Sequence, residues 1–328
     1  MSFIAVLPID LFTSAMVGND YLLVFTVVAS FYFFLRSVDD INRGPVINYQ
    51  NLIFLSLLVI IGSLTKQHGL ILLAFPTAIL LVVILKQTMN VFKIFLPVYI
   101  FLIALSFSNE LWKYDNTGKI LVSNQDFYDN AINQFPGSLE KIEFISFKIS
   151  SLYKNPFLSN ETAASLPTEI FARTFFDYEW RFLSPNISAA ISVGRIAYTI
   201  GVIWVIYFLV TLVFALWKRK GFKFELNKNS ILVCTPVIVG LLYFAVPLIQ
   251  TLRYPYFSSM KATFALPGMI ILLILHAGFT RRIQLPNSFS FFFTILNIFF
   301  GILLISAIYI YLPLSINQLS GPLWAIPQ

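Results

Sequence analysis

Long apolar runs, separated by polar connections, recur from one end of this chain to the other. A helix needs about 20 apolar residues to cross the hydrocarbon of a bilayer, and 58% of the 328 residues are hydrophobic. In lipid every backbone polar group must be paired within the protein, and these runs are too long and uninterrupted for barrel strands. The chain is therefore predicted to be an all-α integral membrane protein.

About eight membrane-spanning helices are expected. The apolar runs are 20–35, 51–64, 68–85, 91–107, 191–217, 230–250, 263–279 and 291–312, with a stub of another at 1–9. The roughly 80 residues after the fourth run are too many for a simple connection, so we expect them to form a folded external layer. The expected domains are N-terminal transmembrane helices at 1–107, an extracytoplasmic loop domain at 108–190, C-terminal transmembrane helices at 191–312 and an external tail at 313–328.

Two helices are expected within the loop domain. Four apolar residues recur at the spacing of a helix that lies along the membrane surface: Ile142, Ile145, Ile149 and Leu152. A second helix is expected to start near Pro167, with Thr168 as its cap, and to run to about Phe176.

Lysine and arginine are concentrated in every second connection between the apolar runs. These connections carry Arg36, Arg43, Lys86, Lys93, Lys218, Arg219, Lys220, Lys223, Lys228, Arg281 and Arg282. The intervening short connections carry only Lys66, Arg253 and Lys261. By the positive-inside rule the first set is cytoplasmic, so the formal charge of +7 reports topology and does not indicate nucleic-acid binding. A bacterial inner membrane or the endoplasmic reticulum is the expected location.

Four polar features lie at the expected outer ends of helices. Asp20 stands at a helix start, where a capping role and a role in a site are equally expected. Lys66, followed by Gln67 and His68, breaks the charge rule, and a bound anionic phosphate explains this better than a snorkelling side chain. The other two features are Arg253 and Lys261 on either side of Tyr256, and the cluster of Asp177, Glu179 and Arg181, for which a solvated loop is the simpler interpretation.

Three stretches on the outer side occur in a characteristic order: Pro8 through Asn19-Asp20-Tyr21-Leu22-Leu23, then Leu64-Thr65-Lys66, then Phe257 through the Leu266-Pro267 helix start. Together they resemble the GT-C superfamily of membrane glycosyltransferases. The closest resemblance is to the branch of protein mannosyltransferases and aminoarabinose transferases, which use polyprenyl-phosphate sugars. A looser likeness covers residues 166–182.

The resemblance implies sugar transfer on the non-cytoplasmic face. The polyprenyl-phosphate donor would lie in membrane lipid, and the acceptor would be a hydroxyl of a protein, lipid or glycan. Asp20 would be the catalytic base or the ligand of a divalent metal, and whether it serves as base, ligand or cap stays open. Cations would stabilise the departing phosphate. The implied substrate-binding residues are Lys66, Gln67, His68, Arg253, Tyr256 and Lys261, with Asp10, Asp177, Glu179 and Arg181 as further possible site residues.

The start of the chain departs from that family. Its members carry the principal catalytic acid in a first external loop, whereas Asp10 is the only acidic residue before Asp20 here. We expect either the C-terminal part of a longer enzyme or a truncated, inactive relative, and favour the first. Two other classes stay open: a transporter, which normally buries ionisable groups at mid-membrane, and a non-catalytic assembly subunit.

Overall fold

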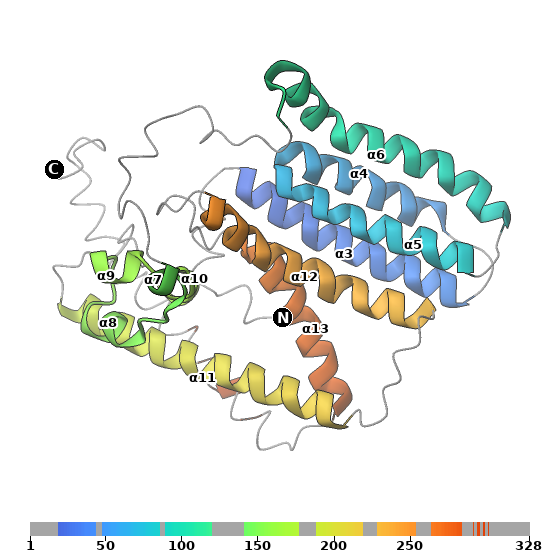
Figure 1. The fold of residues 1–328 in the computed structure, drawn as a ribbon. Coiled ribbons are helices and arrows are strands. Elements are labelled where there is room, and N and C mark those ends of the chain that lie inside the picture. The colour runs from blue at the N-terminus through green and yellow to red at the C-terminus, as the bar shows by residue number, and fades with distance from the viewer. Residues whose placement is uncertain are drawn as a thin grey trace, which may run out of the picture.

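The described part of the chain is helical. The computed structural model describes residues 19–43, 48–85, 89–119, 141–176, 188–218, 228–253 and 264–283, with residues 291, 294, 295, 298 and 301. No strand occurs among them (Figure 1). Five helical segments are long and apolar enough to cross a membrane: Leu22–Ile41, Gln67–Leu85, Phe92–Thr117, Ser188–Thr211 and Cys234–Leu252. The chain is therefore a multi-pass membrane protein.

The helices fall into a long or apolar group and a short group. The long or apolar ones are α3 (Asn19–Arg43), α4 (Tyr49–Thr65), α5 (Ala74–Leu85), α6 (Met89–Thr117), α11 (Ser188–Lys218), α12 (Lys228–Arg253) and α13 (Leu266–Ile283). A 3-10 helix, η1 (Gln67–Leu73), leads directly into α5. The short helices are α7 (Lys141–Ile145), α8 (Ile149–Lys154), α9 (Asn160–Ala163) and α10 (Leu166–Phe175).

The predicted apolar runs within the described ranges are helical, although their limits differ. α3 continues from the predicted run 20–35 as far as Arg43. The run 51–64 lies in α4, which has 17 residues and is one of two apolar helices shorter than the candidate spans. Residues 1–9 and most of 291–312 lie outside the described residues. The number of eight spans thus remains a prediction.

α6 is longer than the sequence predicts. Its helix continues to Thr117, so the predicted domain boundary between 107 and 108 falls inside it. Gly118 follows with a φ of 66°, and its N–H donates to the Tyr114 carbonyl at 2.8 Å. This left-handed conformation after the last helical residue is a common way for a helix to end.

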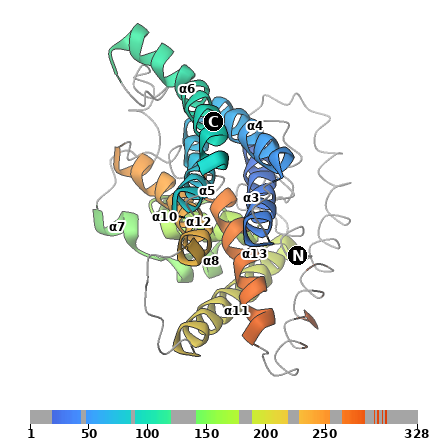
Figure 2. The ribbon, with the colours of Figure 1, turned by 90° about the vertical axis from the view of Figure 1, so that its right-hand side faces the viewer.

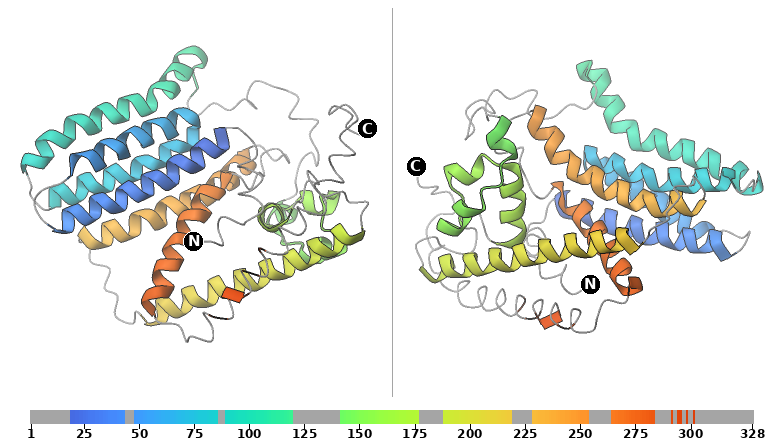
Figure 3. Two further views of the ribbon diagram at one scale, coloured as in Figure 1. Left: turned by 180° about the vertical axis from the view of Figure 1, so that it is seen from behind. Right: turned by 60° about the horizontal axis from the view of Figure 1, so that its bottom comes forward.

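Two apolar cores meet along α13. One core joins α3, α4, α5 and α6, which lie side by side (Figures 1 and 3), and it includes Phe34, Leu55 and Phe75. The other joins α8, α10 and α11. α12 and α13 cross at Gly240 and Gly268, where a Cβ on Gly268 would lie 2.3 Å from the Gly240 oxygen. Figures 1 and 2 show α13 running from beside α12 toward the same side of the molecule as the end of α11.

Successive long or apolar helices alternate in direction. Therefore α3, η1 and α13 begin at one end of the bundle, and α4, α6 and α12 end there (Figure 1). We call this the Lys66 end. The connections rich in lysine and arginine leave from the opposite end, so that the Lys66 end is the predicted non-cytoplasmic one.

Residues 141–176 pack on the N-terminal part of α11. Arg195 Nε donates to the Tyr153 carbonyl at 2.7 Å, and the buried Tyr198 hydroxyl donates to the Pro156 carbonyl at 2.6 Å. Phe175 fills the space above Gly201, where a Cβ would lie 2.7 Å from its ring. Whether these short helices form a layer outside the membrane stays a prediction.

The two helices predicted in this segment have different outcomes. A single helix through Ile142 and Leu152 is wrong, because α7 and α8 are separated at residues 146–148, where the Lys148 N–H donates to Thr168 Oγ1 at 2.8 Å. The helix predicted near Pro167 is confirmed as α10. The prediction of Thr168 as its cap is wrong, because Thr168 lies inside the helix. The cap is Ser165, whose hydroxyl accepts the Thr168 N–H at 3.2 Å.

Candidate functional site

A tight turn connects α4 to η1. Lys66 is extended, its N–H donates to the Gly62 carbonyl at 3.2 Å, and its carbonyl accepts the Gly69 N–H at 2.8 Å. A Cβ on Gly69 would lie 2.0 Å from the Gly62 oxygen, so only glycine fits there. Residues Lys66 to Gly69, which we call the Lys66 turn, are therefore folded tightly against the last turn of α4.

Three successive side chains of the Lys66 turn contact three different elements. Lys66 Nζ lies 5.3 Å from the ring centroid of Phe264, just before α13, which is a cation–π distance. Gln67 Nε2 donates to Glu110 Oε2 of α6 at 2.7 Å. The His68 ring meets Phe264 and Tyr243 of α12 edge-on, at centroid distances of 5.5 and 6.1 Å. The turn is thus held between α6, α12 and the start of α13.

Glu110 is a site residue that the sequence analysis missed. Its side chain is 6% exposed, and its second oxygen accepts Lys113 Nζ at 2.7 Å. The apolar run ends at residue 107, so the pattern of hydropathy predicts that Glu110 lies in an external loop. A signal was present, because neither glycine nor proline occurs between Pro97 and Gly118. This spacing allows the helix to continue past the apolar run.

The backbone brings Asp20 to the Lys66 end. α3 and α4 run antiparallel and meet where a Cβ on Gly62 would lie 3.1 Å from Thr26 Oγ1. From this contact α3 extends about 9 Å back to Asp20 and α4 extends about 6 Å on to Lys66, in the same direction. The side chain of Asp20 lies outside the described residues.

The remaining predicted site residues are not tested by the structure. Arg253 is the last residue of α12 and so lies at the Lys66 end, but its side chain is outside the described part. Also outside the described residues are Tyr256, Lys261, Asp10, Asp177, Glu179 and Arg181. Among the side chains that are described, no three or more His, Cys, Asp and Glu residues group to hold a metal. Asp20 as a metal ligand stays a prediction.

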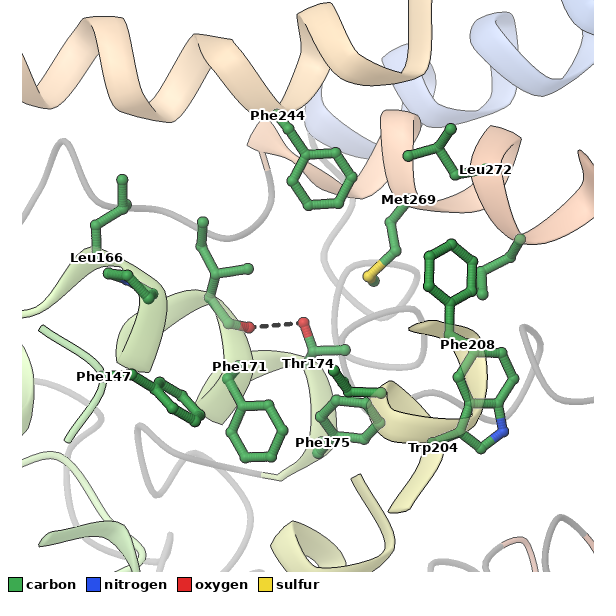
Figure 4. A pocket seen from close by; sticks show the side chains of 14 residues that line it. Phe147, Leu166, Phe171, Thr174, Phe175, Trp204, Phe208, Phe244, Met269 and Leu272 are labelled. Carbon is green, nitrogen blue, oxygen red and sulfur yellow. Dashed lines mark hydrogen bonds between the residues drawn. The ribbon is translucent and has the colours of Figure 1, made fainter. Parts of the chain in front are cut away.

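An apolar cavity of about 460 Å³ lies among α10, α11, α12 and α13 (Figure 4). Its walls are formed by Phe147, Leu166, Pro167, Ile170, Phe171, Thr174, Phe175, Trp204, Val205, Phe208, Phe244, Met269, Leu272 and Leu273. The hydroxyl of Thr174 donates to the Ile170 carbonyl at 2.7 Å, within its own helix. The cavity therefore offers an almost wholly apolar wall, which suits hydrocarbon better than a polar group.

The α12–α13 pair separates the cavity from the Lys66 turn. Two neighbours in α12 show this directly, because Tyr243 contacts His68 of the turn whereas Phe244 lines the cavity. α13 is shared in the same way, with Ile271 in the core of α3 to α6 and Leu273 in the cavity wall. A polar and an apolar surface thus face opposite sides of one helix pair.

Comparison of the chain with protein-family models, with curated protein sequences and with solved protein structures found no match in any of the three. Inference of function therefore depends on the residues and the geometry of this chain.

Proposed function

We propose that this chain is a membrane glycosyltransferase, or the donor-binding part of one, that takes a sugar from a polyprenyl-phosphate donor on the non-cytoplasmic face. The observation that carries the proposal is the Lys66 turn. It holds a lysine over an aromatic ring, next to a glutamine and a histidine, at the end of the bundle opposite the lysine- and arginine-rich connections. A short loop on that side normally lacks lysine, so a function for this cation is expected.

The chemistry of sugar transfer assigns roles to Lys66 and Asp20. When a sugar leaves its phosphate, negative charge develops on the phosphate oxygens, and a fixed ammonium such as Lys66 stabilises that charge. Asp20, in the first turn of α3 at the same end, is the proposed base for the acceptor hydroxyl. Surrounding lipid and the apolar cavity supply surfaces for the hydrocarbon part of the ligands.

The first test is lipid binding by the full chain reconstituted in nanodiscs. A polyprenyl phosphate and the matching polyprenol differ only in the phosphate, and we expect only the first to bind specifically. Lys66→Met should weaken that binding about tenfold or more, because a charge-assisted contact is lost. Lys154→Met is the matched control, since this exposed lysine lies in α8 and should leave binding unchanged.

Transfer is the second test. In a form of the protein that is active with labelled polyprenyl-phosphate sugars and hydroxyl acceptors, Asp20→Asn should lower the rate of transfer about a hundredfold. The loss of a helix cap alone would cost only about 1 kcal/mol of stability. Equal binding of polyprenol and polyprenyl phosphate, or normal binding by Lys66→Met, would contradict the proposal. The transporter and assembly-subunit interpretations would then be preferred.

A further inference from the structure

We propose that Glu110 is a positioning residue that fixes the Lys66 turn in its binding geometry. The identity of the bound ligand rests on the proposed function, whereas the contacts of Glu110 do not. Its carboxylate bonds Gln67 with one oxygen and Lys113 with the other, both at 2.7 Å. Glu110 therefore joins the turn to the C-terminal part of α6, which is 43 residues away in the sequence.

α6 has few other contacts that could hold it to the turn, so the bond from Gln67 to Glu110 matters for their relative position. Only 22% of its candidate span is buried, the smallest share among the five candidate spans. Few apolar contacts are therefore available to hold its outer end against the turn. Hydrogen bonds to an ionised group are roughly twice as strong as those between neutral groups, so the contacts of Glu110 are suited to this task.

The opposite side of the turn is held differently. There Lys66 and His68 contact the ring of Phe264, and His68 also contacts Tyr243. Aromatic contacts permit sliding of the rings, whereas a two-oxygen carboxylate fixes the distance and direction of its donors. Glu110 is thus the directional constraint on the turn, and the aromatic residues provide the packing.

A purely electrostatic role for Glu110 predicts the opposite result from a positioning role. Removing a carboxylate near Lys66 makes the site more positive, which by charge alone would tighten the binding of a phosphate anion. Loss of positioning would instead loosen the turn and weaken binding. The isosteric variant Glu110→Gln separates these two possibilities, because it removes the charge and keeps the size of the side chain. Its one acceptor oxygen cannot serve both Gln67 and Lys113 as the two carboxylate oxygens do, and the bond from Gln67 loses its charge assistance.

The test uses the full chain in nanodiscs with two measurements: amide hydrogen exchange of residues 66–72, and binding of a polyprenyl phosphate. Glu110→Gln should speed exchange in the turn and weaken binding about tenfold. Asp115→Asn is the matched control, because Asp115 is an exposed residue of the same helix and the substitution also removes one negative charge. The control should change neither measurement, and exchange in α5 should stay as in the wild type in both variants.

A reciprocal exchange of the two side chains provides the rescue. The double variant Gln67→Glu with Glu110→Gln again places an amide opposite a carboxylate. It should recover slow exchange in the turn, so that the two substitutions are strongly non-additive. A variant that merely misfolds would show no such recovery.

The outcomes separate the two proposals. Unchanged exchange in Glu110→Gln, or tighter phosphate binding with unchanged exchange, would overturn the positioning role whether or not the wild type binds the lipid. If the wild type binds no polyprenyl phosphate while exchange responds and is rescued as expected, the positioning role of Glu110 is supported and the proposed ligand is wrong.

Discussion

The Lys66 turn and the apolar cavity lie on opposite sides of one helix pair and are built in contrasting ways. The turn depends on directional contacts, such as the bond from Gln67 to Glu110. The cavity depends on aromatic and aliphatic packing from four helices, and its Thr174 hydroxyl is paired inside its own helix. Single polar substitutions should therefore alter the turn, whereas the cavity should respond mainly to changes in shape.

The two ends of the bundle are predicted to lie on opposite sides of the membrane, and this gives the prediction with the largest effect. In a Cys234→Ser background, a cysteine at Asp115 near the Lys66 end should react with an impermeant thiol reagent in sealed cells. A cysteine at Asp39, at the opposite end of α3, should not react until the membrane is opened. Both positions are exposed, so access alone decides the result. The reverse labelling pattern would invert the orientation and remove the turn from the outer face.

The helix pair that separates the two regions should be sensitive to a single methyl group. Gly268→Ala places a Cβ 2.3 Å from the Gly240 oxygen and 2.7 Å from the Tyr243 Cβ, so the helices must move apart. We expect a loss of about 3 kcal/mol in the free energy of unfolding, measured by denaturant titration in mixed micelles.

Gly278 of the same helix provides the control for this prediction. Nothing lies within 4 Å of a Cβ built there, so Gly278→Ala should be neutral or slightly stabilising. Equal stability of the two variants would show that the close approach of α12 and α13 is not required.

Two threonines, Thr174 in the cavity wall and Thr211 of α11, should give the smallest and unequal effects on stability. Thr211 contacts the buried His276 ring nitrogen through its hydroxyl, so Thr211→Val should cost about 1–3 kcal/mol by leaving that nitrogen without this partner. Thr174 bonds only a carbonyl of its own helix among the contacts described, so Thr174→Val should change stability by about 0.5 kcal/mol or less. Thermal unfolding of both variants measures the difference. A larger loss at Thr174 would show that the cavity wall uses polar contacts.

Apolar length was sufficient to predict most of the transmembrane helices. The runs at 191–217 and 230–250 correspond to α11 and α12 within a few residues, because a helix in lipid must satisfy its own backbone. The Leu266-Pro267 start of α13 also agrees, since proline in a first turn has no N–H to leave unpaired. These features are local, and a local pattern can specify them.

Features that depend on contacts between distant residues were not predictable in the same way. Hydropathy marks where an apolar run ends, but α6 continues past that point through Glu110 and Lys113. Gln67, the hydrogen-bond partner of Glu110, is 43 residues away in the sequence. The break between α7 and α8 likewise involves a bond from Lys148 to Thr168, which helical spacing alone does not reveal. Of the candidate site, Lys66 was recognised because it breaks a charge rule, whereas Glu110 breaks none.

The attachment of residues 141–176 to α11 has a consequence for how such a protein changes over evolution. Arg195 and Tyr198 bond the main-chain oxygens of Tyr153 and Pro156, and a carbonyl is present whatever side chain stands at those positions. These two bonds therefore do not depend on the identity of the residue that supplies the oxygen, whereas the buried contact of Phe175 with Gly201 does. Exposed positions of this segment can change in sequence over evolution without loss of its attachment to α11, so related proteins could differ in what they bind there.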